Sequence, residues 1–179
     1  YATVAEQLYQ LDPTADAAYS LAIMFLKRQE FDKTEGYLKE AIAKSEDNEA
    51  KAEYYLKMAQ LQLAKKQYQA TKTNALEVLK LNPNNGTALM LIGKAYANSA
   101  SNYGEDDFDH ASVFWAAVDK FQKAKQADPA MTEEADKLIG IYSQHFPSKD
   151  EAFFRSVTDG ATVKIGSWIN ESTKARFRK

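Results

Sequence analysis

The chain has 179 residues, of which 23 are basic and 25 acidic, so its formal net charge at pH 7 is −2. This near balance argues against a nucleic-acid-binding surface, which usually carries a basic stripe. The absence of cysteine excludes disulfides, thiolate zinc ligands and a thiol nucleophile. The most apolar run, Ala17–Leu26, is too short to span a bilayer, so we expect no direct membrane insertion.

Helical periodicity begins at the start of the chain. Residues 1–13 predict half of a helical repeat, which ends at Asp12-Pro13. A first full helix pair follows over residues 15–48, with its turn at Gln29-Glu30-Phe31. Because Tyr1 is not a methionine and already lies in a helical pattern, we expect further sequence on its N-terminal side.

The second pair, over residues 52–85, has the clearest pattern. Small and apolar residues recur along one face of its first helix, at Tyr55, Ala59 and Leu63. They do so again in its second helix, at Thr71, Ala75, Val78 and Leu79. One such pair cannot bury its apolar face alone, so we expect neighbours of the same kind.

The third pair occupies residues 86–129 and contains an insertion over 99–108. An acidic run precedes its second helix, and we expect Asp107 or Asp109 to be the N-cap. A final helix is predicted over 132–145, with Thr132 as its N-cap.

Residues 147–179 predict a different, C-terminal unit. After a short helix and a turn at Asp159-Gly160, residues 162–169 alternate polar and apolar side chains, and a turn leads to a second strand over 173–178, which indicates a β-hairpin. Because a two-stranded hairpin is marginal alone, we expect Ile165, Trp168 and Phe177 to pack on the last helices.

The helix pairs are similar to one another at fixed spacing. The small residue of the first helix runs Ala22, Ala59, Gly93, at intervals of 37 and 34 residues. The third pair matches the pattern in both helices, with Gly93 and Tyr96 in the first, Ala117, Phe121 and Ala124 in the second, and Pro129 as the closing proline. Over residues 1–146 this pattern resembles the tetratricopeptide repeat (TPR). Gln62 departs from it where an aromatic is expected, and Glu46 where the closing proline is expected.

The resemblance implies an all-α fold, a TPR-like helical solenoid of antiparallel helix hairpins in a right-handed superhelix, with a small C-terminal β-hairpin. It also implies a non-catalytic protein–protein interaction scaffold, because this repeat is a framework for partners and carries no chemistry. A protein or peptide segment would bind on the concave face, through the second, fifth, ninth and twelfth residues of each first helix. Those partner-binding residues are Tyr19, Ile23, Leu26, Glu53, Leu56, Gln60, Leu63, Met90 and Lys94.

Three alternatives remain open. The same apolar residues can pack on further repeats instead of a partner. The chain can be a structural assembly subunit that self-associates through its C-terminal strands, or a regulatory domain of a longer enzyme.

The tail also resembles the end of TPR proteins of bacterial cell envelopes, which implies a location in the bacterial periplasm or cell envelope.

The residues offer little catalytic chemistry. His145 is the last residue of the predicted final helix and has no accompanying nucleophile motif, so we interpret it as structural. His110 lies in the acidic run, which lacks the ligand spacing of a calcium loop. The glycines form no phosphate-binding motif. We therefore expect no enzyme activity, no metal site and no cofactor.

Overall fold

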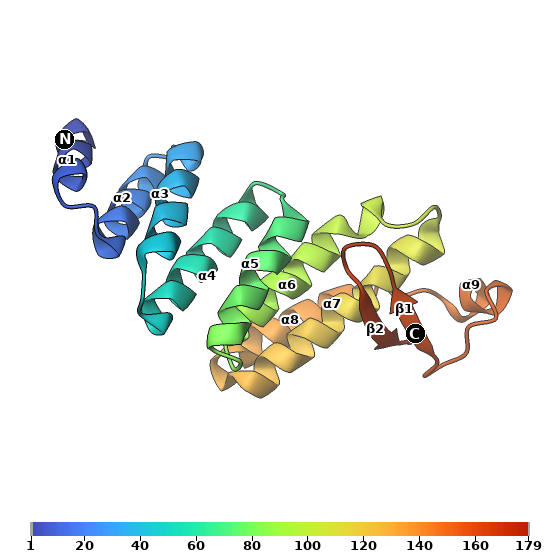
Figure 1. The fold of residues 1–179 in the computed structure, drawn as a ribbon. Coiled ribbons are helices and arrows are strands. Elements are labelled where there is room, and N and C mark those ends of the chain that lie inside the picture. Colours follow the sequence, from blue (N-terminus) through green and yellow to red (C-terminus); the bar gives the residue numbers. More distant parts are fainter. Residues whose placement is uncertain (1, 179) are drawn as a thin grey trace.

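The computed structural model describes residues 2–178 of the protein. Within this range there are nine α-helices and one two-stranded antiparallel sheet, and the helices pack in adjacent pairs along an elongated solenoid (Figure 1). The N-terminal helix lies at one end of the solenoid and the C-terminal hairpin lies toward the other. The predicted all-α solenoid with a small C-terminal β-hairpin is confirmed.

The helices are α1 (Ala2–Leu11), α2 (Ala15–Lys27), α3 (Phe31–Lys44), α4 (Asn48–Ala64), α5 (Tyr68–Leu81), α6 (Gly86–Ser99), α7 (Asp107–Ala127), α8 (Thr132–Ser143) and α9 (Lys149–Phe154). Two 3₁₀ turns, η1 (Ala100–Asn102) and η2 (Pro129–Met131), follow α6 and α7. Strands β1 (Thr162–Ile165) and β2 (Glu171–Lys174) pair from Thr162 opposite Lys174 to Ile165 opposite Glu171.

The two helices of the first pair and the two helices of the second pair are joined by loops of the same conformation. Gln29 and Lys66, 37 residues apart, both adopt left-handed backbone, with φ of 61° and 59°. The N–H groups of the next residues, Glu30 and Gln67, each donate to the carbonyl five residues back. This closes the C-terminus of the first helix in a Schellman motif and turns the chain into the second helix. The sequence repeat is therefore also a repeat of backbone conformation.

The small residue of each first helix is buried within its pair. Ala22 and Ala59 are fully buried, and a Cβ on Gly93 would lie only 2.5 Å from Cε1 of Phe121. Ala22 shares a buried cluster with Leu38 of its second helix, Ala59 shares one with Ala75, and Gly93 lies against Phe121.

Two predicted caps are wrong. The N-cap of α7 is Asp106, whose extended backbone lets its carboxylate accept from the N–H of Asp109 at 3.0 Å. Thr132 is not an N-cap, because η2 runs directly into α8 and gives Thr132 helical backbone.

The strands are also shorter than the alternating pattern predicts. Ser167 and Asn170 have left-handed backbone, with φ of 54° and 43°, and the N–H of Asn170 donates to Gly166 O. This tight loop ends β1 at Ile165, before the alternation of the sequence ends.

The hairpin and the tail pack on α6 and α7, and Val163 and Phe177 also share a cluster with Ile139 and Tyr142 of α8. The Trp168 ring lies 5.6 Å from the Tyr96 ring of α6, and Phe177 lies 6.5 Å from Trp115 of α7. The indole N–H of Trp115 also donates to the carbonyl of Arg176 at 2.6 Å. The tail thus covers one side of the third helix pair.

A polar network at Glu171 fixes the hairpin in place. The Glu171 carboxylate accepts from the Tyr96 hydroxyl at 2.8 Å and pairs with the Lys120 ammonium at 2.7 Å. The Lys72 ammonium of α5 donates to the carbonyls of Trp168 and Ile169, at 3.2 and 2.5 Å. The hairpin is thereby tied to α5, α6 and α7.

Burial alone opposes ionisation of Glu171. The bond from Lys120, supported by Tyr96 and Lys72, outweighs burial and leaves the pKa of this carboxyl below its ordinary value. Burial also lowers the pKa of the Lys72 ammonium. Because the folded state favours the ionised carboxylate, Glu171 adds stability above its unfolded pKa of about 4.5 and loses it as the pH falls through the lowered folded pKa.

Gly93→Ala should destabilise the protein by about 1–2 kcal/mol, because overpacking against Phe121 exceeds the gain of about 1 kcal/mol in helix propensity. The double change Gly93→Ala/Phe121→Leu, which recreates the Ala22–Leu38 combination, should be more stable than the sum of the single changes, by at least about 0.5 kcal/mol. Urea unfolding measures both. Gly140→Ala, whose Cβ would meet open space, is the control and should be neutral or stabilising. Additive single changes would contradict the close contact.

Glu171→Gln should destabilise the protein by about 1–3 kcal/mol at pH 7, because Lys120 loses its charged partner. The variant should also lose less stability than the unchanged protein as the pH falls below about 4.5. Denaturant unfolding across this pH range, followed by tryptophan fluorescence, tests both points. Glu46→Gln at an exposed site is the control. Equal acid sensitivity of Glu171→Gln and the unchanged protein would contradict the role of Glu171.

Candidate functional site

An apolar groove of about 800 Å³ lies between α1 and α2, at the N-terminal end of the solenoid. We call it the N-terminal groove. Its apolar walls include Ala5, Leu8, Leu11, Leu21, Ile23 and Met24. Its polar members are Asp12, Ser20 and Lys27. A concave site of this size and chemistry suits an apolar side-chain cluster of a ligand.

The exposure of Leu8 explains why the groove is open. Leu8 lies five residues before Pro13, as Val78 lies before Pro83 and Ala124 before Pro129. Val78 and Ala124 are fully buried, because α4 covers α5 and α6 covers α7, whereas Leu8 is 61% exposed. Among the described residues, no helix covers this face of α1 in the way that α4 covers α5 and α6 covers α7. The N-terminal groove therefore has the shape of a position for one more antiparallel helix.

Part of the predicted concave set forms contacts within the protein. The Tyr19 hydroxyl donates to Glu53 at 2.7 Å, and the Tyr54 hydroxyl donates to Asp16 at 2.7 Å. These reciprocal bonds join α2 to α4, and the two tyrosine rings lie 4.5 Å apart. Tyr19 and Glu53 thus hold adjacent helix pairs together in this structure.

A similar reciprocal arrangement joins α1 to α3. The Tyr9 hydroxyl donates to Glu40, and the Tyr37 hydroxyl donates to Glu6 at 3.2 Å. The orientation of α1, and with it one wall of the N-terminal groove, depends on these bonds.

The other predicted residues are spread over several environments. Met90 is only 2% exposed, so it is a core residue in this structure and offers no surface to a partner. Lys94 pairs with Glu134 of α8 at 2.6 Å. Leu26, Leu63 and Gln60 are half-buried on α2 and α4.

Two more predicted residues, Glu53 and Leu56, line a separate pocket of about 530 Å³ beside Asn82 and Asn85. Of the nine predicted residues, only Ile23 lines the N-terminal groove. The structure therefore does not gather the predicted set into one site.

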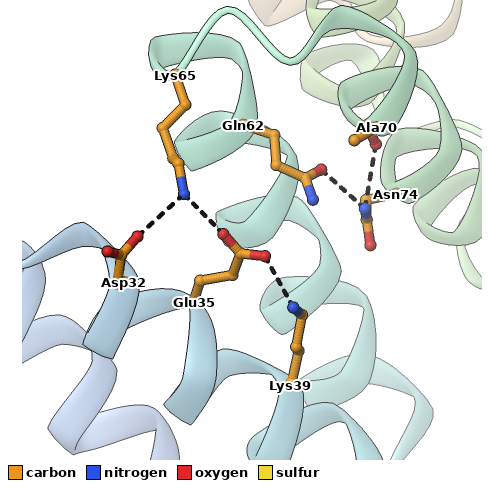
Figure 2. Close-up of polar contacts among 7 residues, drawn as sticks. All are labelled: Asp32, Glu35, Lys39, Gln62, Lys65, Ala70 and Asn74. Carbon is orange, nitrogen blue, oxygen red and sulfur yellow. Dashed lines mark hydrogen bonds and ion pairs between the residues drawn. The ribbon is translucent and has the colours of Figure 1, made fainter.

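Polar side chains of α3, α4 and α5 form a network that links the first helix pair to the second (Figure 2). Lys65, at the C-terminus of α4, bridges to Glu35 at 2.8 Å and to Asp32 at 3.5 Å on α3. Hydrogen bonds from Lys39 and then Lys65 hold the pKa of Glu35 below its ordinary value. This network contributes to joining the pairs, because Lys65 and Glu35 are both largely shielded from solvent.

Gln62, which departs from the repeat pattern, has a specific partner. Its side-chain oxygen accepts from the Asn74 amide at 2.8 Å, and the same amide donates to Ala70 O (Figure 2). Gln62 is 7% exposed, and this bond compensates for burying its polar group.

The sequence interpretation missed the wall that α1 contributes. Val4, Leu8 and Leu11 follow i, i+4, i+7 spacing, which marks one face of a helix. This signal was present in the sequence, but which face stays uncovered depends on the packing of α1.

The histidines lie apart from the groove. His145 stacks 5.4 Å from Phe114, and His110 Nδ1 lies 4.0 Å from Asp107. Across residues 2–178, no group of three or more histidine or acidic side chains is placed to hold a metal ion. In the same range, no helix combines the length and apolarity needed to cross a membrane.

No protein-family model matches the sequence, and no curated protein matches it either.

Tyr54→Phe should weaken the α2–α4 contact. Burial, followed by the bond to Asp16, raises the pKa of Tyr54 to about 12, so the neutral phenol stabilises the fold. This contribution is complete below pH 10 and is lost as the pH rises through about 12.

The variant should therefore lose about 1 kcal/mol at pH 7 and show a smaller further loss in alkali. Denaturant unfolding over a pH series measures both effects, with Tyr68→Phe, outside this contact, as the control. The contact would be unimportant if Tyr54→Phe and Tyr68→Phe behaved alike at both pH values.

Proposed function

We propose that the protein is a non-catalytic interaction scaffold whose N-terminal groove receives an apolar helical segment of a protein partner. The observation that supports this most directly is the 61% exposure of Leu8, at a register position that is fully buried in α5 and α7. Transfer of such an apolar surface out of water is favourable, so a matching helix gains free energy by covering it.

The shape of the groove favours a helix over an extended strand. Its walls are two consecutive helices, and no sheet edge lies there to pair with a strand. In the second and third pairs the corresponding space holds α4 or α6, each of which presents a small residue to its neighbour. Helix-in-groove recognition uses apolar anchors at i, i+3, i+4 and i+7.

The tetratricopeptide-like repeat is part of the same proposal. Recurrent helix pairs, the repeated Schellman loop and the small residues Ala22, Ala59 and Gly93 support it. Such repeats present surfaces to other proteins, and each stacked pair depends on its neighbours for burial.

A peptide from the protein itself can test the groove. Residues 48–64 form α4, a first helix of a pair, and contain both acidic and basic residues for solubility. A fluorescently labelled peptide of this sequence should bind the full chain with a dissociation constant of roughly 1–100 μM, measured by anisotropy.

Leu8→Glu and Ile23→Glu should each weaken binding at least about tenfold, because each would bury an unpaired carboxylate. Leu76→Glu, on a 39% exposed leucine of α5, is the matched control and should bind normally. No binding by the unchanged protein, or equal binding by all three variants, would refute the proposal.

A further inference from the structure

The solvent-facing stripe of α1 is apolar and uncharged. Val4, Leu8 and Leu11 are 56, 61 and 82% exposed and follow one helix face. The neighbouring exposed residues of α1 are Gln7 and Gln10, which carry no charge. A stripe of this kind can meet an identical stripe without bringing like charges together.

We propose that two copies of this chain pair through α1, with the α1 helix of each copy lying antiparallel in the N-terminal groove of the other. The inference rests on the proposed function, because it names a second copy as the source of the helix. Each α1 then covers the other copy's groove as α4 covers α5, so both exposed Leu8 side chains become buried by one two-fold contact. Isologous two-fold contacts are the commonest form of self-association.

Charge on the groove agrees with this orientation. Asp12 follows α1 and Lys27 ends α2, and both line the groove. Because Asp12 precedes the first residue of α2 and Lys27 is its last residue, these two side chains lie toward opposite ends of this wall of the groove. An antiparallel α1 from a second copy brings its Asp12 to the end that holds Lys27. Because the contact is two-fold symmetric, this pairing of Asp12 with Lys27 occurs twice.

The remaining charge on α1 does not oppose the contact. Glu6 is the sole charged residue of α1, and it is directed to α3, where it accepts from Tyr37 at 3.2 Å and pairs with Lys33 at 3.3 Å. The seam between the two α1 helices is therefore free of charged side chains.

The size of the seam sets the expected strength. A ten-residue helix is about 15 Å long, which places the interface at the lower end of the range for specific contacts. We expect a dimer with a dissociation constant of roughly 1–100 μM.

Sedimentation of the full chain across this concentration range tests the pairing. Leu8 is the central residue of the stripe, so it lies nearest the axis and meets its counterpart. Leu8→Lys and Leu8→Glu should each be monomeric, whereas an equimolar mixture of the two should form a dimer again. Circular dichroism of each variant checks that its helices are intact. A monomeric unchanged protein, or variants that dimerise normally when alone, would overturn the proposal.

A cross-linking experiment gives an independent test, because the chain contains no cysteine. Mild oxidation of Leu8→Cys should give a disulfide-linked dimer, since the two thiols meet at the axis. Leu76→Cys, at an exposed leucine of α5, is the matched control and should stay monomeric. Equal cross-linking of both variants would count against the α1 contact.

The peptide of residues 48–64 separates this inference from the proposed function. If the groove accepts either helix, the peptide should convert dimer to monomer as its concentration rises. A monomeric protein that still binds the peptide would refute self-pairing and leave the proposed function intact. Failure of both self-association and peptide binding would remove both.

Discussion

The close approach of two helices at one small residue is the constraint on which this fold depends. Ala22, Ala59 and Gly93 are buried at the corresponding position of each first helix, where a small residue leaves room for the second helix. In the third pair, glycine is needed because Phe121 fills that space. Protein interiors are packed too densely for either partner to change alone.

One helical turn after the small residue, each first helix has a side chain whose partner differs in chemistry from pair to pair, although the backbone conformation is the same. In the first pair Phe25 stacks on Tyr37 at 5.5 Å, and in the second Gln62 bonds to Asn74. In the third, Tyr96 and Lys120 both bind Glu171 of the hairpin. The repeat supplies one scaffold, and these positions adapt each pair to its neighbours. The third pair has become the docking site for the C-terminal tail.

The two ends of the described solenoid differ in how far their apolar side chains are covered. Toward the C-terminus, the hairpin buries Ile165 and Ile169 against the main core and is held by charged and backbone contacts. In the N-terminal groove, apolar side chains stay exposed, because the face of α1 that carries Leu8 and Leu11 is not the face that bonds to α3. An apolar solenoid face that is left uncovered favours association. The functional proposal rests on this difference between the two ends and not on a reactive group.

The helix pairs, their repeat and the C-terminal hairpin could be predicted from the residues alone, because period, turn residues and proline positions are local signals. Which helix faces are covered depends on how the helices pack. Tyr19 and Glu53 have the spacing of a binding surface, yet they bond to each other across α2 and α4. Met90 is enclosed, while Leu8, at a position that is buried in other pairs, is exposed. Helical periodicity specifies the direction of a side chain on its own helix, but burial depends on neighbours that are distant in sequence.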